Sequence, residues 1–211
     1  MSDFTLIIGT KNVSSWSLRG WLVLKHSGVD FEEVLIQLRP TWDQEKLNAL
    51  TPAGKVPVVK KGDQYIWDSL AIAEYFNDLC PEKLFWPADI DSRAHARSVS
   101  AEMHSGFVPL RSVMPMDCMN SYDVPEMTPE LSKDINRVKK LWTDCRKQYA
   151  DQGPFLFGKY SIVDMMYAPV VFRFKAYQIE LPAVLQEYCD ALVNHPDIQE
   201  WLTDCNSADI T

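Results

Sequence analysis

Three serines near the start of a predicted helix are the residues of this chain best suited to chemistry. The segment between a short apolar strand, residues 4–8, and an apolar-periodic helix predicted for residues 17–27 contains Ser14, Ser15 and Ser17. The first N–H groups of a helix have no partner inside the helix. Together with hydroxyl donors they form a site suited to an anion such as a thiolate. The alternative is that one of these serines simply caps the helix.

A proline in the third predicted strand is the second unusual feature. This strand reads Val56-Pro57-Val58-Val59, and proline cannot donate to a β-ladder. A cis bond between Val56 and Pro57 at the strand entrance would leave the backbone N–H and C=O of Val56 facing outward, where they can pair with an extended ligand. The alternative is an ordinary trans proline at the beginning of a strand.

The elements that must position these residues alternate between strands and helices over the first eighty residues. The apolar spacing predicts a strand, a helix, a strand, an irregular link, two strands joined by a tight turn, and a helix, at residues 4–8, 17–27, 31–37, 41–50, 56–59, 64–67 and 70–79. A βαβ start implies a parallel strand pair with a right-handed crossover, and the closing hairpin adds an antiparallel edge. We therefore expect a small mixed sheet with helices packed on it.

The rest of the chain is predicted to be helical. Residues 1–80 form the first domain, residues 81–91 form a proline-containing linker, and residues 92–211 form the second domain. The apolar spacing of the second domain predicts one long helix that passes Leu110 and ends before Pro115, followed by further helices.

One helix start in the second domain carries a capping signal. Ser161 at the N-cap position and Asp164 three residues later form an acidic variant of the capping box. We expect this pair to be structural, so that mutating it costs stability before it affects chemistry.

Composition limits the possible functions. The 211 residues carry a formal net charge of −8, which argues against nucleic acid and an anionic membrane surface as partners. No apolar run approaches the ~20 residues of a membrane span, and no signal peptide is evident. The five cysteines are scattered without C-x-x-C spacing, and the four histidines lack metal-ligand spacing. We expect thiols in a reducing cytoplasm and no metal site.

Taken together, these features resemble the glutathione S-transferase family over essentially the whole chain. The paired serines look most like the serine-type classes, particularly the zeta class, although Trp16 stands where that class usually has cysteine. The segment of residues 101–116 looks like a bacterial branch of such transferases. The resemblance is carried by Ser14-Ser15-Trp16-Ser17-Leu18-Arg19, Lys55-Val56-Pro57-Val58, Asp68-Ser69-Leu70-Ala71-Ile72 and the Ser161-x-x-Asp164 box.

The resemblance implies a thioredoxin-like α/β first domain that binds glutathione and an all-α second domain that supplies the wall for a hydrophobic electrophile. It also implies a homodimer. By its position in the family's motif, Ser14 would donate to the glutathione sulfur, and Ser15 is the second candidate. Ser17 is expected to be the helix cap. Lowering the thiol pKa by about two units from about 8.5 requires roughly 2.7 kcal/mol of preferential stabilisation of the thiolate.

The same resemblance gives the other parts of glutathione their partners. Ser69, at a helix start, suits the γ-glutamyl carboxylate or acts as a cap, and Asp68 takes the α-amino group. Val56 beside Pro57 pairs with the cysteinyl backbone. Lys55 reaches the glycine carboxylate or is simply solvated. Trp16 is counted among the binding residues, with its role left open.

The electrophile pocket is expected on the long helix of the second domain. Met103, His104, Phe107 and Arg111 lie there at helical spacing, and His104 and Arg111 could meet a polar substrate group. The alternative is that a stripe of methionine and aromatic residues belongs to the core.

We therefore expect a cytoplasmic transferase of detoxification in which a glutathione thiolate attacks an electrophilic carbon. One alternative is glutathione-dependent cis-trans isomerisation of a maleyl-type double bond. Another is a non-catalytic relative that serves as a binding or regulatory module. The presence of Ser14, Ser15 and Ser69 argues against the last, because a scaffold need not keep both a thiol donor and a carboxylate cradle.

Overall fold

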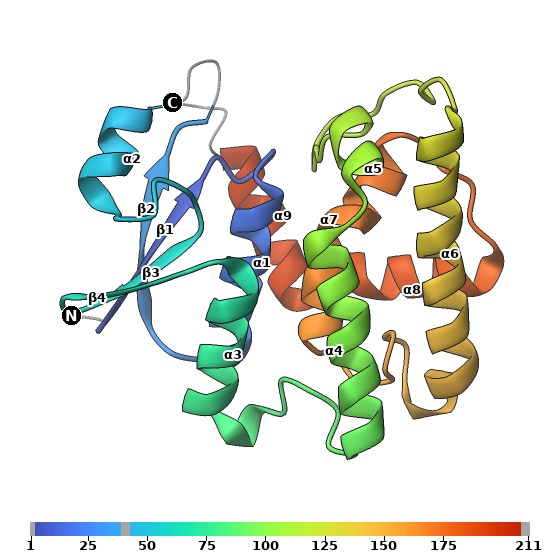
Figure 1. The fold of residues 1–211 in the computed structure, drawn as a ribbon, viewed down its shortest axis with the longest axis horizontal. Coiled ribbons are helices and arrows are strands. Elements are labelled where there is room, and N and C mark those ends of the chain that lie inside the picture. The colour runs from blue at the N-terminus through green and yellow to red at the C-terminus, as the bar shows by residue number, and fades with distance from the viewer. Residues whose placement is uncertain (1–2, 39–42, 208–211) are drawn as a thin grey trace. The chain divides into compact units, whose positions relative to one another are not determined.

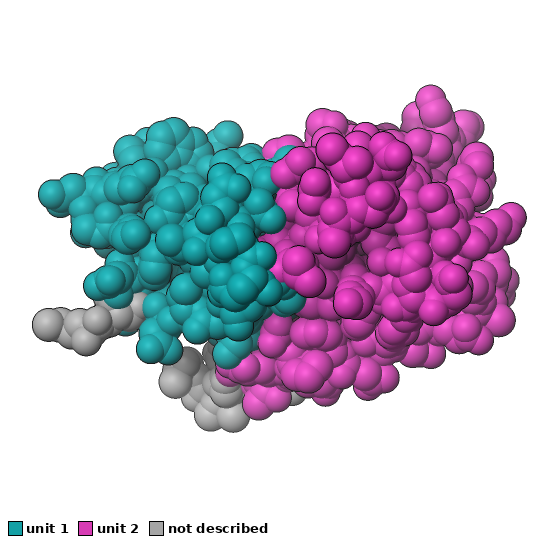
Figure 2. Space-filling model, turned by 90° about the horizontal axis from the view of Figure 1, so that it is seen from below, with its two compact units in different colours: residues 1–83 teal, residues 84–211 magenta. Residues whose placement is uncertain are grey.

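The computed structural model describes residues 3–38 and 43–207. They form two compact units, which divide between Lys83 and Leu84 (Figure 2). This division lies inside residues 81–91, the segment predicted as a linker.

A four-stranded mixed sheet forms the centre of the first unit. Its spatial order is β2-β1-β3-β4. β1 pairs parallel with β2 and antiparallel with β3, and β3 pairs antiparallel with β4. The predicted mixed sheet is therefore confirmed, with a crossover helix joining its one parallel pair. The strands are β1 (Phe4–Gly9), β2 (Phe31–Ile36), β3 (Val58–Lys61) and β4 (Gln64–Trp67).

Helices cover both faces of this sheet because its strands are apolar on alternating sides. The Phe4 ring lies 5.4 Å from the ring of Phe76 in α3, and Figure 1 shows α1 and α3 packed side by side. On the opposite face, Leu47 of α2 packs with Ile7 and Val58. The helices are α1 (Ser15–Ser27), α2 (Gln44–Leu50) and α3 (Ser69–Leu79), and the short 3-10 turn η1 (Pro81–Lys83) follows α3.

The second unit is helical throughout its described elements, which confirms the predicted fold class. Its core is built on α7, where Tyr167 and Phe174 place their rings 5.7 and 5.4 Å from that of Trp142 in α6. Tyr188 of α8 adds a third ring at 5.2 Å. The elements are α4 (Ile90–Ser105), α5 (Val108–Val113), α6 (Pro129–Tyr149), η2 (Ala150–Gln152), α7 (Ile162–Ala176), α8 (Ala183–Val193) and α9 (Pro196–Ser207).

The prediction of one long helix through Leu110 was wrong. The chain breaks at Gly106, and Phe107 adopts a left-handed conformation with φ +57° before α5 begins. Pro109 explains the break, because in a continuous helix its ring would clash with the carbonyl of Ser105 and no N–H would be present to pair with it. At the start of a new helix the same proline is tolerated.

The new helix is capped from a neighbouring element. Asp134 of α6 accepts a hydrogen bond from the backbone N–H of Leu110 at 3.1 Å through Oδ2, so a side chain distant in sequence satisfies one of the first N–H groups of α5.

The described residues contain neither a membrane-spanning helix nor a cluster of metal ligands. No helix among them combines the length and the apolar character that crossing a membrane requires. Within residues 3–38 and 43–207, no three His, Cys, Asp or Glu side chains gather closely enough to hold a metal ion.

Candidate functional site

Strand register brings the three predicted binding segments to one end of the sheet. Val58 at the start of β3 stands opposite Ile7 in β1 and opposite Trp67 at the end of β4. Because both pairings are antiparallel, the ends of β1 and β4 lie beside the beginning of β3. The segments carrying Ser14, Pro57 and Ser69 therefore leave the sheet at the same end.

The first of these segments is fixed by a chain of hydroxyl contacts. Ser14 is the N-cap residue of α1 by backbone position, but its side chain makes no cap hydrogen bond. Instead Ser14 Oγ lies 2.7 Å from Ser17 Oγ. Ser17 Oγ in turn accepts a hydrogen bond from the backbone N–H of Gly9 at 2.9 Å. Both serines are buried, so the first turn of α1 is held against the end of β1.

The predicted role of Ser17 as the helix cap was wrong. The helix begins at Ser15, two residues earlier than predicted, and this places Ser17 inside the first turn. A residue there has helical backbone angles, so its hydroxyl is not where an N-cap oxygen must be. The spacing of Ser14 and Ser17, three residues apart across a helix start, was the signal for their contact.

Trp16 has a partner within its own helix. The guanidinium carbon of Arg19 lies 4.4 Å from the centre of the Trp16 ring, which is a cation–π contact. Arg19 is 1% exposed, and the first turn of α1 contains no acidic side chain. The positive end of the helix is therefore not offset by an acid in its own first turn, and a nearby cation adds to it.

Pro57 stands just before the ladder of its strand. The Val56-Pro57 peptide bond is cis, and β3 begins at Val58, two residues later than predicted. Lys55 is exposed and Val56 is half-buried, whereas Pro57 is buried. The proline is thus compatible with the sheet because it donates nothing to it.

Gly20 is a positioning residue that sequence reasoning missed. A Cβ atom at Gly20 would lie 2.9 Å from both Cβ and Cγ of Pro57, which is closer than such contacts allow. The missing side chain therefore lets α1 approach the proline. The signal was present in the sequence, because a glycine in a helix interior costs about 1 kcal/mol relative to alanine and so indicates a local packing constraint.

In the third segment, Asp68 is the cap of the helix and Ser69 is not. Asp68 is the N-cap of α3, and its Oδ1 accepts from the backbone N–H groups of Leu70 and Ala71 at 2.9 and 3.3 Å. Its backbone has φ +74°, a conformation that is costly for a residue other than glycine. The capping alternative for Ser69 is wrong, since the preceding residue provides the cap.

The hydroxyl of Ser69 is an unsatisfied buried group. Ser69 is 2% exposed, and its Oγ has no hydrogen-bond partner among the described residues. Leaving a buried hydroxyl unpaired costs about 1–3 kcal/mol. Ser69 Oγ lies in the first turn of α3, where a carboxylate would meet both this hydroxyl and the positive end of the helix.

The residues predicted to contact an electrophile do not share one helix. Met103 and His104 end α4, whereas Phe107 precedes α5 and Arg111 lies within it. Met103 and Phe107 are buried, as the core alternative expects. His104 is half-buried, and Arg111 donates to the carbonyl of Gly106 at 3.3 Å. The break at residues 106–107 removes the common helical face.

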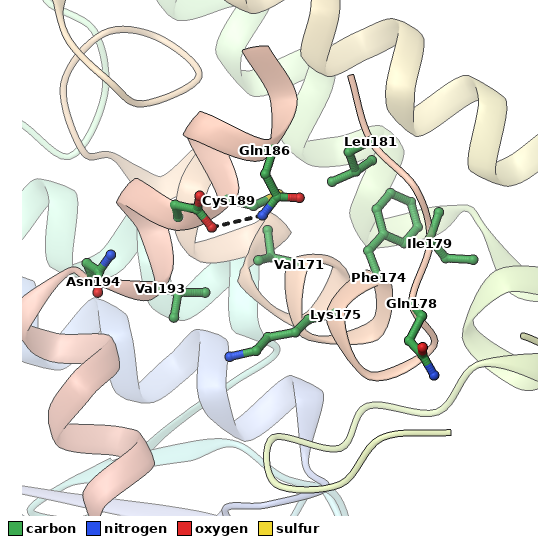
Figure 3. A pocket seen from close by; sticks show the side chains of 11 residues that line it. Val171, Phe174, Lys175, Gln178, Ile179, Leu181, Gln186, Cys189, Val193 and Asn194 are labelled. Carbon is green, nitrogen blue, oxygen red and sulfur yellow. Dashed lines mark hydrogen bonds between the residues drawn. The ribbon is translucent and has the colours of Figure 1, made fainter. Parts of the chain in front are cut away.

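The helical unit also has cavities that the sequence did not indicate. One of about 370 Å³ lies between α7 and α8, with Val171, Phe174 and Leu181 among its apolar walls (Figure 3). Lys175 and Gln186 line it too, and Gln186 donates to Asp190 at 2.8 Å. Two others measure about 210 and 420 Å³. None of these three cavities is lined by a residue predicted for the electrophile.

The capping box of α7 is confirmed. Asp164 Oδ2 accepts from the backbone N–H and the hydroxyl of Ser161 at 3.0 and 3.1 Å, and Oδ1 accepts from the N–H of Leu156 at 3.1 Å. Burial raises the pKa of Asp164 to about 7, against the lowering effect of these donors. All its partners are structural groups, so the residue belongs to the fold.

Comparison with known families gives two matches. The model of the glutathione S-transferase N-terminal domain matches residues 13–79, and the model of the glutathione S-transferase C-terminal domain matches residues 128–204.

Curated relatives include both isomerases and transferases. A probable maleylacetoacetate isomerase of Caenorhabditis elegans is 37% identical over 106 residues, which are 50% of this chain and 49% of that protein. The chain thus spans about half the length of that relative. Glutathione S-transferase L3 of Arabidopsis thaliana is 25% identical over 98% of this chain and 80% of its own length. Maleylacetoacetate isomerase of Rattus norvegicus is 28% identical over 79% of this chain and 76% of its own length.

Solved structures share the fold. A glutathione transferase homolog from Burkholderia, crystallised with bound glutathione, has a TM-score of 0.72 and 25% identity, covering 97% of this chain and 98% of its own. A theta class glutathione S-transferase from Xanthomonas axonopodis pv. citri has a TM-score of 0.70 and 20% identity, covering 96% of this chain and 98% of its own.

Proposed function

Because the chain belongs to the glutathione S-transferase family, a family of enzymes, we propose that it activates bound glutathione for attack on a hydrophobic electrophile. Glutathione is its co-substrate, and a related structure was solved with glutathione bound. The observation that carries the proposal is the buried, unpaired hydroxyl of Ser69. It lies at the same end of the sheet as the contact between Ser14 and Ser17.

Ser14 is the proposed donor to the glutathione sulfur. A hydroxyl hydrogen can rotate, so the 2.7 Å contact between the two serines also permits Ser17 to donate to Ser14. In that arrangement the Gly9 N–H donates to Ser17, Ser17 to Ser14, and Ser14 to the thiolate. Each hydrogen bond in such a chain polarises the next.

The magnitudes are sufficient for the chemistry. A hydrogen bond to a charged group contributes about 1.5–3 kcal/mol, and a helix N-terminus adds about 0.3–1 kcal/mol. Their sum covers the roughly 2.7 kcal/mol that a two-unit lowering of the thiol pKa requires. Ser15, the first residue of α1, is the second candidate donor, and Trp16 with Arg19 stabilises the turn that carries both serines.

The remaining contacts follow the tripeptide. Ser69 Oγ and the first turn of α3 receive the γ-glutamyl carboxylate, and the carboxylate of Asp68 attracts the α-amino group. The backbone of Val56, beside Pro57, pairs with the cysteinyl residue. The exposed Lys55 meets the glycine carboxylate.

The electrophile is assigned to polar residues of the helical unit. The half-buried His104 and Arg111 are the proposed contacts for a polar substrate group, whereas Met103 and Phe107 are assigned to the core because both are buried. We further propose that the protein is a homodimer and acts in detoxification in the cytoplasm. Light scattering of the purified chain tests the homodimer.

Two alternatives to this transferase function can be told apart from it. Glutathione-dependent maleyl isomerisation is favoured by the maleylacetoacetate isomerases among the relatives, and it is opposed by Trp16, which replaces the usual zeta-class cysteine. A non-catalytic binding or regulatory module would need neither Ser14 nor Ser69. Parallel assays of a chloro-nitrobenzene substrate and of maleylacetoacetate separate the two activities.

The direct experiment measures glutathione binding and turnover for the Ser14→Ala and Ser15→Ala variants. We expect Ser14→Ala to bind glutathione but to lose most of the ultraviolet absorbance of the bound thiolate, with turnover near neutral pH about 10–100-fold lower. Ser98→Ala, which removes an exposed helical serine hydroxyl, is the matched control. If both serine variants keep full turnover, the donor assignment is wrong. If the unmodified protein neither binds nor turns over glutathione, the binding-module alternative holds.

A further inference from the structure

One carboxylate, that of Glu33 on β2, joins three separate parts of the first unit. Its Oε2 pairs with the ammonium of Lys11 at 2.7 Å, and its Oε1 accepts a hydrogen bond from the indole Nε1 of Trp21 at 2.6 Å. The Lys11 ammonium also lies 5.2 Å from the centre of the Trp21 ring, which is a cation–π contact. Lys11 lies between β1 and α1, whereas Trp21 lies inside α1. We call these three residues the Glu33 cluster.

The Glu33 cluster differs from an ordinary surface ion pair by its burial. Lys11 and Trp21 are buried, whereas the side chain of Glu33 is 32% exposed. Lys25 brings a second ammonium to 5.4 Å from the centre of the Trp21 ring. Burying an ammonium is costly even when it is paired, and apolar side chains in place of a buried pair often give equal stability. Stability alone therefore does not account for the pair, and the geometry that it fixes is the more informative property.

The geometry in question is that of the turn leading to Ser14. The carbonyl of Thr10 accepts hydrogen bonds from the backbone N–H groups of Val13 and Ser14 at 3.3 and 3.0 Å, which makes residues 10–14 compact. The hydroxyl of Thr10 accepts from the backbone N–H of Leu38, just after β2, at 3.0 Å. The turn is thus tied to β2 and the residues that follow it at two points, by the Thr10 hydroxyl and by the Lys11 ammonium.

Ser14 lies between the two groups that the Glu33 carboxylate binds. Lys11 is three residues before it, and Trp21 is seven residues after it, about two helical turns into α1. Because both are bound to one carboxylate, the chain on both sides of Ser14 is fixed relative to β2. We propose that Lys11 and Glu33 are positioning residues for the thiol donor Ser14, which they hold in place through the turn of residues 10–14. This inference rests on the proposed function of Ser14.

A positioning role and a direct effect of charge give opposite results when Glu33 is replaced by glutamine. Removing a negative charge near a thiolate lowers the thiol pKa through the electric field alone, whereas a misplaced hydroxyl donor raises it. The glutamine side chain has an acceptor on one side only and a donor on the other. In Glu33→Gln, either Lys11 or Trp21 therefore loses its contact, and the position of Ser14 is no longer fixed on both sides.

The test measures the pKa of glutathione bound to the full chain, from the ultraviolet absorbance of the thiolate as the pH is varied. We expect Glu33→Gln and Lys11→Met each to raise this pKa by about half to one unit, which lowers kcat/KM about 3–10-fold below pH 6 and less at higher pH. Lys11→Arg keeps the cation and should lose less. Lys140→Met is the matched control, because it removes an exposed ammonium that is paired with Asp144 at the same 2.7 Å, and it should change neither quantity.

A second measurement does not involve glutathione. Hydrogen exchange of the backbone amides in residues 10–14 should be about tenfold or more faster in Lys11→Met than in the unmodified protein, because the turn opens locally once its anchor is lost. Unchanged exchange would show that the ion pair does not hold the turn. If Lys11→Met does not fold, Glu33→Gln decides alone, since position and charge move its thiol pKa in opposite directions.

The outcomes separate this inference from the function on which it rests. A bound thiol with a lower pKa in Glu33→Gln than in the unmodified protein would show that the charge acts and not the position. A thiol pKa that is the same in both variants and in the unmodified protein would overturn the positioning role and leave the role of Ser14 intact. If the unmodified protein binds no glutathione thiolate, the proposed function is wrong, and this inference with it.

Discussion

The hydroxyl of Ser14 lies 2.7 Å from that of Ser17, whose oxygen also accepts the backbone N–H of Gly9. This contact joins the N-cap of α1 to the last residue of β1, so the orientation of the proposed thiol donor is set by the sheet itself. A donor held in this way does not need to be reoriented when the thiolate forms, which is the general advantage of preorganised hydrogen bonds.

Replacing Ser17 with alanine should therefore change catalysis although Ser17 does not touch the sulfur. We expect the pH profile of kcat/KM to move to higher pH by about half to one unit, with a smaller loss of activity at high pH than at neutral pH. The free energy of unfolding should also fall by about 1–3 kcal/mol, because the Gly9 N–H loses its partner. A purely structural role would lower stability and leave the pH profile unchanged, and Ser98→Ala should change neither.

Ser69→Ala should change glutathione binding without lowering stability, whereas Asp68→Ala should affect both. Ser69→Ala removes a buried hydroxyl that has no partner among the described residues, so the free energy of unfolding should not fall, whereas the Kd for glutathione should rise about tenfold. Asp68→Ala removes the cap of α3 and should cost about 1 kcal/mol of stability, and it should also weaken glutathione binding because the proposed partner of the α-amino group is lost. Calorimetric titration measures the Kd for glutathione, and denaturant unfolding measures the free energy of unfolding. Unchanged glutathione affinity in Ser69→Ala would contradict the proposed carboxylate contact.

Gly20→Ala should reverse the usual effect of this substitution. In a solvent-exposed helix interior, alanine in place of glycine stabilises by about 1 kcal/mol. Here the added Cβ would lie 2.9 Å from Pro57, so we expect a loss of about 1–3 kcal/mol and weaker glutathione binding, because α1 and the proline must separate. Thermal unfolding with and without glutathione measures both. A stabilised variant with normal glutathione binding would show that the close approach of Gly20 to Pro57 is not needed for binding.

Asp117 should make the stability of the helical unit sensitive to acid. Burial alone would raise the pKa of this carboxyl, but hydrogen bonds from Tyr122, Asn120 and the N–H of Met119 outweigh it and lower the pKa to about 2. A carboxyl whose pKa is lower in the folded than in the unfolded state stabilises the fold above about pH 4. This contribution is lost as the pH falls from about 4 towards 2.

Asp117→Asn removes that titration. We expect the variant to be less stable than the unmodified protein at pH 7 and to lose less stability between about pH 4 and 2, as measured by denaturant unfolding at each pH. Asp144→Asn, at a carboxyl paired with Lys140 on the surface, is the control. Parallel pH profiles for Asp117→Asn and the unmodified protein would exclude this role.

Periodicity was enough to predict most of the sheet and most helices, because strand 4–8 and the later helices have regular apolar faces. It failed at Gly106 because the apolar residues on either side keep helical spacing across the break. Pro109 was the contrary signal, three residues further on, and it acts through a clash with the carbonyl of Ser105.

The sequence was enough to predict which residues belong to the candidate site, but not which of them touch each other. Ser14, Pro57 and Ser69 stand out by their places at helix or strand starts, but the closeness of Gly20 to Pro57 depends on how α1 packs. Asp134 as the cap of α5 was hidden for the same reason.

The strand register has a practical consequence for probes of this protein. With the segments proposed to contact glutathione gathered at one end of the sheet, the β3–β4 hairpin turn occupies the other end, where Gly62 has open space around it. A fluorophore attached at the exposed Asp63 would lie at the far ends of β3 and β4 from Pro57 and Ser69. Short sequence insertions should be accepted there for the same reason.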